Sequence, residues 1–371
     1  MIGRGELLRP SPWFFSEYTP RAVESDEEEG KSLKGVFPMS QNTLSREAKR
    51  RKGSLERKKT LVALSFIAPN FIGFALFTLI PVVIAVFMSM TEWNGGKLGD
   101  MQWVGLANYE KLFAVPQRYI DRLENPNFFS IIGLFFDKVD LGIALKNTVA
   151  YTVITVPLTL VCSIALALVL NKAVKGAVAF RAILFFPYVS STVAICVCWN
   201  FMMMKNGPIN QLLMFFGSTF NKTWTADSNM AIWAVIIVSV WKSMGYYMVI
   251  YLAALQGIPR ELYEAATVDG ANKWQQFTHI TLPQLSPTTF FVSVMLVIGC
   301  FKVYDTVALM TGGGPGRATK MLVTYIIDEF NSFKYGSACA IAMVLLVLVL
   351  SVTLLQFRME KKFSADEGKE V

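Results

Sequence analysis

Six long apolar segments constrain the fold of this chain more strongly than any other feature of its sequence. A helix needs roughly 20 predominantly apolar residues to cross the hydrocarbon core of a bilayer. Segments of this length lie at about 61–90, 144–170, 182–204, 230–256, 287–310 and 336–357. Because a chain in lipid must satisfy its backbone polar groups internally, each segment is predicted to be a helix. We therefore expect an all-α membrane protein with six transmembrane helices.

The composition supports a membrane protein and argues against a soluble one. Of the 371 residues, 53% are hydrophobic, and the mean hydropathy is +0.43, which is high for a soluble domain. The net charge of +8 needs an explanation, because basic chains often bind nucleic acid. Here the basic residues cluster beside apolar segments, where they fix membrane orientation. We therefore expect contact with membrane lipid and no nucleic-acid partner.

Lysine and arginine residues predict the orientation of the spans. Eight of them lie in residues 46–59, before the first span, and three more lie in residues 172–181, after the second span, without an acid. Loop 91–142 instead holds more acids than bases. Since cytoplasmic loops carry the excess of basic residues, both termini are predicted to be cytoplasmic. The polar segment between the fourth and fifth spans is then cytoplasmic as well.

The ends of the chain differ in character from the apolar region. Residues 1–60 are interpreted as a disordered, basic cytoplasmic segment. Residues 1–38 hold an acidic run and several prolines without apolar periodicity, and they are either native or an added extension before Met39. The six-helix domain is expected over residues 61–358, with a short cytoplasmic tail over residues 359–371.

A polar segment, residues 259–283, separates the fourth and fifth apolar segments. Pro259 suits the first position of a helix, because the amide hydrogen that it lacks has no partner there. Glu261 and Glu264 lie near the expected N-terminus of the helix, where negative charge is favoured. We expect a short helix that ends at Gly270 in a left-handed conformation.

A second short helix is expected after Gly270. Asn272 is a suitable N-cap, and Pro283 is expected to end the helix. The predicted helix–turn–helix lies across the cytoplasmic face. From this pattern alone it is either an amphipathic connector packed under the bundle or a docking element for another protein.

The spacing of this segment resembles the EAA loop of permease subunits from ATP-binding-cassette (ABC) importers. The matching positions are Glu264-Ala-Ala266, Gly270, Ile280 and Leu282-Pro283. Further segments resemble the carbohydrate permeases related to the MalF maltose-importer subunit, and together they extend the resemblance to about residues 60–358. These segments are Phe186-Pro-Tyr188, Ile209-Asn210, Trp241, Leu255-Gln-Gly-Ile-Pro259, Phe301-Lys-Val-Tyr-Asp305 and Thr311-Gly-Gly-Gly-Pro315.

The resemblance implies a fold and an assembly. It implies the type I ABC importer permease (MetI-like) fold, in a prokaryotic cell membrane. The implied partners are a second, MalG-like permease subunit, two ATPase subunits and an extracytoplasmic solute-binding protein. ATP and magnesium are then bound by the ATPase subunits, and this chain carries no cofactor of its own. Loop 91–142 is too short for the large extracytoplasmic domain of the enterobacterial maltose subunit, so maltose itself is not inferred.

The resemblance also gives the docking element a role. In the family, the Glu-Ala-Ala helix sits in a cleft of an ATPase subunit, and ATP-driven closure of the ATPases switches the permease between its inward-facing and outward-facing states. Glu264 is then expected to make a polar or ionic contact with the ATPase. Ala265, Ala266 and Gly270 are expected to permit close packing.

Polar groups inside the spans are the candidates for the solute pathway, because burying them in lipid is costly. The charged ones in the fourth and fifth spans are Lys242, Lys302 and Asp305. Lys302 and Asp305 are three residues apart, so on one helix they would share a face and pair. They are interpreted either as a structural ion pair or as groups that hydrogen-bond to sugar hydroxyls.

Aromatic rings are the second pathway signal, since a tyrosine packs against the apolar face of a pyranose and adds a hydrogen bond. Each ring alone is better explained as core filling or as part of an interfacial aromatic belt. The resemblance places Tyr188, Thr192, Ser243 and Tyr246 at positions that contact sugar in the maltose permease. In the fifth span the matching residues, Gly299, Cys300 and Val303, are not obvious sugar ligands, so Lys302, Tyr304 and Asp305 are taken instead.

The predicted function is therefore import of a sugar, a di- or oligosaccharide, coupled to an external ATPase. A permease for another polyol-type solute such as glycerol phosphate is the alternative, and a self-contained secondary transporter is a weaker one, because no inverted-repeat halves are visible. The chain is expected to be no enzyme, since it lacks a Walker A pattern and a Gly-x-Ser-x-Gly motif. With one histidine and no Cys-x-x-Cys pair, neither catalytic residues nor metal ligands are expected.

Overall fold

The computed structural model describes residues 62–122, 127–171 and 176–367. The predicted segment 1–60 lies outside the described residues, as do most of the basic residues from which the orientation was predicted. The chain divides into two units, one up to Leu79 and one from Ile80 onward. The described part of the first unit is helical over residues 62–74 and continues in a π-helix, η2 (Ala75–Leu79). Its apolar side chains are exposed, as expected for a surface in lipid.

The second unit begins with α3 (Ile80–Ser89) and a short hairpin. In the hairpin, β1 (Thr91–Glu92) pairs with β2 (Gln102–Trp103) in antiparallel register, Thr91 opposite Trp103, around the 3₁₀ turn η3 (Leu98–Asp100). Three short helices follow, namely α4 (Ala107–Phe113), α5 (Gln117–Ile120) and α6 (Phe128–Lys138).

The remaining helices carry the spans and the loops between them. Before the coupling region they are α7 (Asp140–Leu170), α8 (Ala177–Val189), α9 (Thr192–Met202), α10 (Pro208–Phe215), η4 (Trp224–Ala226) and α11 (Ala231–Gln256). After it come α15 (Ser286–Phe301), α16 (Asp305–Met310), α17 (Leu322–Asn331) and α18 (Tyr335–Glu367).

Within the described residues, four helices are long and apolar enough to cross a membrane. They are Val62–Ser89, Asp140–Leu170, Ala231–Gln256 and Tyr335–Glu360. Two bent pairs meet the same test together, Ala177–Val189 with Thr192–Met202 and Lys273–Gln284 with Ser286–Phe301. The helical membrane fold is therefore confirmed, with four continuous spans and up to six when each bent pair counts as one.

The prediction of one continuous helix over 182–204 is wrong. Between α8 and α9 the axis turns by 98°, because Ser190 and Ser191 are extended. Pro187 lacks the amide hydrogen that an unbroken helix would use. The Ser190 hydroxyl donates to the Phe186 carbonyl at 2.8 Å, a side-chain bond that competes with helix continuation.

The prediction of one helix over 287–310 is also wrong. The amides of Lys302 and Val303 bond back three residues, to Gly299 and Cys300, so α15 tightens and ends. Tyr304 then has φ −139° and ψ −60°, and α16 starts at Asp305. Lys302 and Asp305 therefore do not share a helix face, and the ion pairs of the described residues do not include one between them.

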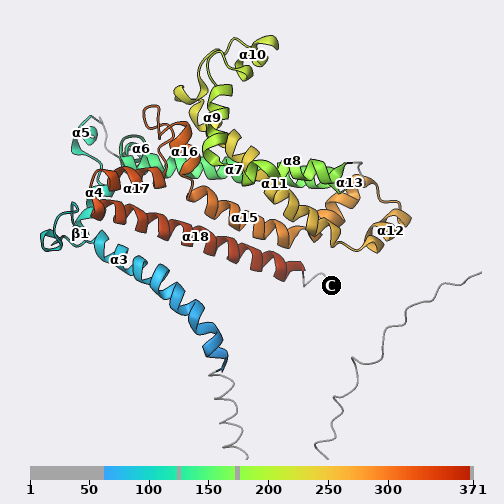
Figure 1. Ribbon diagram of the computed structural model, residues 1–371, viewed down its shortest axis with the longest axis horizontal. Coiled ribbons are helices and arrows are strands. Elements are labelled where there is room, and N and C mark those ends of the chain that lie inside the picture. The colour runs from blue at the N-terminus through green and yellow to red at the C-terminus, as the bar shows by residue number, and fades with distance from the viewer. Residues whose placement is uncertain (1–61, 123–126, 172–175, 368–371) are drawn as a thin grey trace, which may run out of the picture. The chain divides into compact units, whose positions relative to one another are not determined.

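Helix α7 lies at the centre of the bundle and packs against α11, α15 and α17. In Figure 1, α7, α11, α15 and α18 run side by side. The inward face of α7 is lined by small hydroxyl residues, buried at helical spacing: Thr148, Thr152, Thr155, Thr159 and Ser163. Small residues let membrane helices approach closely, and the Ser163 hydroxyl donates across to the Met244 carbonyl of α11 at 3.1 Å.

Gly245 sets the contact between α11 and α8. A Cβ at this position would overlap the backbone carbonyl of Leu184 in α8. Only glycine therefore allows the two helices their present separation. This close approach brings Tyr246 of α11 next to Tyr188 of α8, which matters for the candidate pathway.

Candidate functional site

The coupling segment, residues 259–283, starts with α12 (Arg260–Val268). Pro259 is the residue before the helix, one position earlier than predicted. Gly270 has φ +81°, and the Ala271 amide donates to the Ala266 carbonyl at 2.9 Å. This is the Schellman ending that a left-handed glycine permits, so the predicted stop at Gly270 is confirmed.

The second helix of the coupling segment has the predicted cap. Asn272 accepts a hydrogen bond from the Gln275 amide at 2.9 Å, and the Gln275 side chain accepts from the Asn272 amide at 2.8 Å. This reciprocal pair is a capping box, and it starts α13 (Lys273–Gln276).

Pro283 does not end this helix, contrary to the prediction. The chain passes through the π-helix η5 (Phe277–Thr281) and continues as α14 (Leu282–Gln284). In the wider turn the Leu282 amide reaches the Phe277 carbonyl, so the helix rearranges around the amide that proline lacks. The bend appears at Leu285, where the axis turns by 63° into α15.

Replacing Asn272 with alanine is expected to cost about 1 kcal/mol of local stability, the usual effect of losing an N-cap. Amide hydrogen exchange in residues 273–276 should accelerate, while that of α7 should not change. Replacing the exposed Asn229 with alanine serves as the control. Unchanged protection of residues 273–276 in the Asn272 variant would show that the cap contributes little.

Side-chain hydrogen bonds fasten the two halves of the coupling segment to each other. The hydroxyls of Tyr263 and Thr281 share a hydrogen bond at 2.9 Å. The buried Gln276 donates to the Thr267 hydroxyl at 3.0 Å. Tyr263 and Ile280 also pack against the main hydrophobic core. The segment is thus a firm extension of the bundle and not a loose loop.

The coupling segment exposes polar side chains together with a few large apolar ones. Val268 is 88% and Trp274 70% exposed. Glu264 and Ala265 are exposed beside them, and Ala266 is half-buried. Ala266 and Gly270 line a hollow of about 330 Å³, together with Asp269, Ala271, Gln275, Gln276, His279 and Ile280. The four residues predicted to couple to an ATPase thus lie on one helix and its cap, available to a partner.

The candidate pathway residues gather where α8, α9 and α11 meet. The rings of Tyr188 and Tyr246 stack with centroids 4.3 Å apart and planes 12° apart. Thr192, the first residue of α9, accepts a hydrogen bond from the Lys242 ammonium of α11. Ser243 instead donates to the Ser239 carbonyl of its own helix at 2.6 Å. The structure thus brings together Tyr188, Thr192 and Tyr246, and adds Lys242.

The break between α15 and α16 lies beside the break between α8 and α9. Helix α16 packs against α9 and α11, and the Asn200 side chain of α9 donates to the Leu309 carbonyl at 3.3 Å. Lys302 and Asp305 at this break are exposed, and Tyr304 is half-buried. Two interrupted spans therefore meet around α11. Irregular backbone at membrane depth is tolerated where it faces protein or a water-filled cavity.

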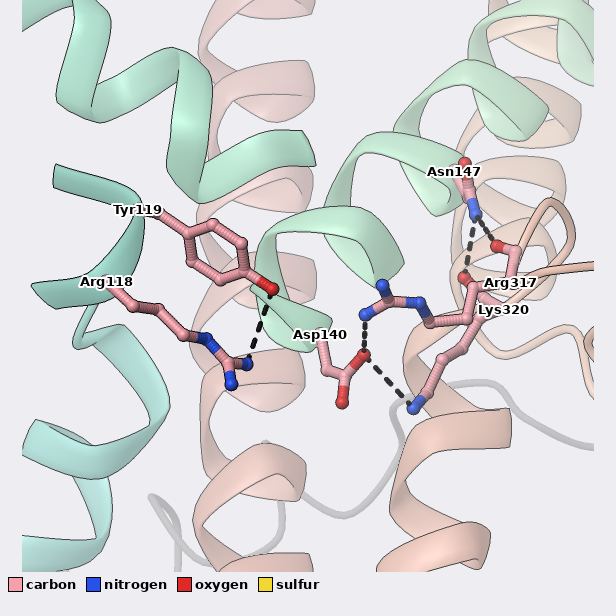
Figure 2. Close-up of polar contacts among 6 residues, drawn as sticks. All are labelled: Arg118, Tyr119, Asp140, Asn147, Arg317 and Lys320. Carbon is pink, nitrogen blue, oxygen red and sulfur yellow. Dashed lines mark hydrogen bonds and ion pairs between the residues drawn. The ribbon is translucent and has the colours of Figure 1, made fainter. Parts of the chain in front are cut away.

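At the N-terminal end of α7, side-chain contacts hold the loop between α16 and α17, residues 311–321. Figure 2 shows Asp140 between Arg317 and Lys320, at 2.6 and 3.6 Å. The Asn147 side chain donates to the carbonyls of the same two residues at 3.0 and 3.1 Å. We call these contacts the outer strap. Arg317 has φ +74°, a conformation that costs a side-chain-bearing residue energy and that the strap maintains.

Within the strap, the amide of Asn147 is expected to matter more than the carboxylate of Asp140. Asp140 and Arg317 are 40% and 46% exposed, and such pairs contribute about 0–1 kcal/mol. Asn147→Leu removes two hydrogen bonds and leaves two carbonyls without this donor, which costs about 2 kcal/mol. Hydrogen exchange of residues 317–321 should therefore rise more in Asn147→Leu than in Asp140→Asn, and the reverse order would contradict this ranking.

Comparison with known proteins relates this arrangement to others. The family described as "Binding-protein-dependent transport system inner membrane component" matches residues 148–365. The probable ABC transporter permease protein YesP of Bacillus subtilis (strain 168) is 34% identical over 318 residues, 85% of this chain and 95% of that protein. The arabinooligosaccharides transport system permease protein AraP of the same organism is 30% identical over 308 residues, 81% of this chain and 89% of the relative.

One solved structure is similar in fold. It is a bacterial ABC transporter involved in the import of the acidic polysaccharide alginate, and the matched chain has a TM-score of 0.65 at 23% identity. The match covers 84% of this chain and 99% of that one. At this level of identity the likeness supports the arrangement of helices and says nothing of the solute.

Proposed function

Because this chain belongs to the family of binding-protein-dependent transport system inner membrane components, we propose that it is the transmembrane permease subunit of an ATP-driven sugar importer. It is a multi-pass protein of the cell membrane. The observation that carries the proposal is the family match over residues 148–365. These residues include both broken spans and the coupling segment. Its part in the importer is transport, and ATP hydrolysis belongs to other subunits.

The solute we propose is a di- or oligosaccharide. The relative AraP is named for the transport of arabinooligosaccharides, and stacked tyrosines suit a sugar ring. We propose that Tyr188, Thr192, Ser243 and Tyr246 line the pathway, with Lys302, Tyr304 and Asp305 at the neighbouring break. A polyol phosphate is the alternative solute.

We further propose that the coupling segment docks on an ATPase subunit, which binds ATP and magnesium. Glu264 supplies a carboxylate at the exposed face, and Ala265, Ala266 and Gly270 supply little bulk. Because the segment is hydrogen-bonded internally and packed on the core, a pull on α12 reaches α11 and α15. A second permease subunit and a sugar-loaded binding protein complete the importer. Transport requires contacts that differ between two states of the ATPase pair.

Reconstitution of the complete importer into liposomes tests the proposal. The chain is assembled with its second permease and ATPase subunits, with ATP inside and the sugar-loaded binding protein outside. Uptake of labelled sugar should require ATP and the binding protein. Uptake by this chain alone, without ATP, would overturn the proposal in favour of a self-contained transporter. Uptake of glycerol phosphate but of no sugar would overturn the solute class alone.

A further inference from the structure

Lys242 is a charged residue in the interior of a membrane-spanning helix. It lies near the middle of α11, is half-buried, and donates a hydrogen bond to the Thr192 hydroxyl. Within the described residues, no carboxylate lies within 4.0 Å of its ammonium. A cation inside a span costs several kcal/mol unless something compensates it. A hydroxyl is a neutral acceptor, so this hydrogen bond does not compensate the charge.

The neighbouring charged groups, one lysine and one aspartate, cancel in sum, so the region keeps one net positive charge. Lys302, at the end of α15, is a second cation, and Asp305, at the start of α16, is an acid. Neither belongs to an ion pair of the described residues. The start of α9 does not offset this charge, because the N-terminal end of a helix is its positive end. Two lysines and one aspartate thus lie on the helices that meet at the two breaks.

We propose that Lys242, with the Thr192 hydroxyl, forms a subsite for an anionic group on a polyhydroxylated solute. The group is a sugar carboxylate or a polyol phosphate. The inference rests on the proposed function and specifies the solute class of that same pathway. A lysine ammonium offers three donors, and its hydrogen bonds to an anionic oxygen are about twice as strong as neutral ones. Tyr188 and Tyr246 offer hydroxyls and ring surface to the uncharged body of the solute.

A neutral sugar fits this subsite less well. It would leave the Lys242 ammonium with neutral acceptors alone, in a site from which the solute displaces water, and an uncompensated buried charge is unfavourable. Compensation of Lys242 by Asp305 of this chain, or by a carboxylate of the second permease subunit, is the competing explanation. In that case the subsite would not discriminate between charged and neutral solutes.

Direct binding to the complete transporter in nanodiscs, without the binding protein, separates these explanations. The probes are two matched pairs, trigalacturonate with its neutral methyl ester and sn-glycerol 3-phosphate with glycerol. Binding of each probe is measured by ligand-observed NMR. In at least one pair, the charged probe should bind about tenfold or more tightly than its neutral match, the effect of one charge-assisted hydrogen bond. The pair that shows the preference identifies the carboxylate or the phosphate as the anionic group.

The variants link the preference to Lys242. Lys242→Met should abolish it, and Lys242→Arg should retain it. Lys205→Met, at an exposed loop lysine, should leave it unchanged. Monodispersity and basal ATPase activity confirm that each complex is assembled.

Three results would overturn the proposed subsite. The first is equal binding of the charged and neutral probes, and the second is a preference for the charged probe that survives Lys242→Met. The third is no binding of either charged probe at 10 mM, about the weakest affinity that a solute subsite needs. The binding measurement uses no ATP hydrolysis. Failure of the preference therefore leaves ATP-dependent uptake intact, whereas failure of that uptake overturns the proposed function.

Discussion

Alanine at position 245 is expected to prevent α8 from packing at its native distance from α11. The added Cβ would overlap the Leu184 carbonyl, and a backbone atom, unlike a side chain, cannot rotate away. Overpacking commonly costs 1–3 kcal/mol, and here we expect about 3 kcal/mol or more, because two helix backbones must separate. The apparent melting temperature of the purified chain, followed by tryptophan fluorescence, should fall by several degrees.

Gly299 provides the matched control for this variant. It lies in α15, and outside its chain neighbours and the backbone of its own helix no heavy atom lies within 4 Å of the position that its Cβ would take. Gly299→Ala should therefore be neutral or slightly stabilising, since alanine favours a helix. Equal melting temperatures for the two alanine variants would contradict the close contact. Loss of the Tyr188–Tyr246 stacking in Gly245→Ala would link the contact to the pathway.

Reversing the charge at Glu264 is expected to uncouple transport from ATP hydrolysis. In the proposed docking mode, Glu264→Lys places an ammonium where the ATPase meets a carboxylate, and an unpaired buried charge costs about 3–5 kcal/mol. We expect sugar uptake to fall at least about 100-fold, since 1.4 kcal/mol is a factor of ten. Because Glu264 is exposed in the isolated chain, the melting temperature of the permease itself should not change.

Glu261→Lys is the control for this reversal. Glu261 is exposed in the first turn of the same helix, so the variant makes the same change in net charge without touching the Glu-Ala-Ala sequence. We expect uptake within a few-fold of the wild type. If both variants transported normally, α12 would be a connector and not a docking element. If both were equally impaired, general electrostatics of the loop and not Glu264 would be responsible.

The long helices were predictable because their lengths are set by the bilayer. The apolar segment 230–256 agrees with α11 (Ala231–Gln256) to within one residue. The segment 336–357 predicts the membrane-crossing part of α18, but the helix continues to Glu367. The apolar segment ends at the edge of the lipid, whereas the backbone hydrogen bonds of the helix continue into the charged residues that follow.

The breaks in the spans were not predicted, because apolar composition is the same for a straight helix and a bent one. Pro187 and Ser190 gave a usable signal for the 98° turn after α8. No comparable signal precedes the end of α15, where the last turn tightens at Gly299 and Cys300. Helix caps, in contrast, depend on local sequence alone. The helix end at Gly270 and the helix start at Asn272 were predicted correctly.

The candidate site was only partly predictable. The sequence identified Tyr188 and Tyr246 separately, but their stacking depends on how closely α8 approaches α11, and thus on Gly245. Lys242 was recognised as an intramembrane charge, yet its contact with Thr192 exists because α9 starts where the third span is interrupted. Contacts across a break of this kind follow from tertiary packing and have no spacing rule.

The outer strap has a consequence for cooperativity. Asp140 and Asn147, both on α7, hold the same two residues of loop 311–321. A movement that separates this loop from α7 therefore breaks all of these contacts, because they hold the same two residues. It loses them together, and the φ +74° conformation of Arg317 relaxes in the same step. We therefore expect opening at this end to be switch-like, because packed interfaces are bistable and not continuously deformable.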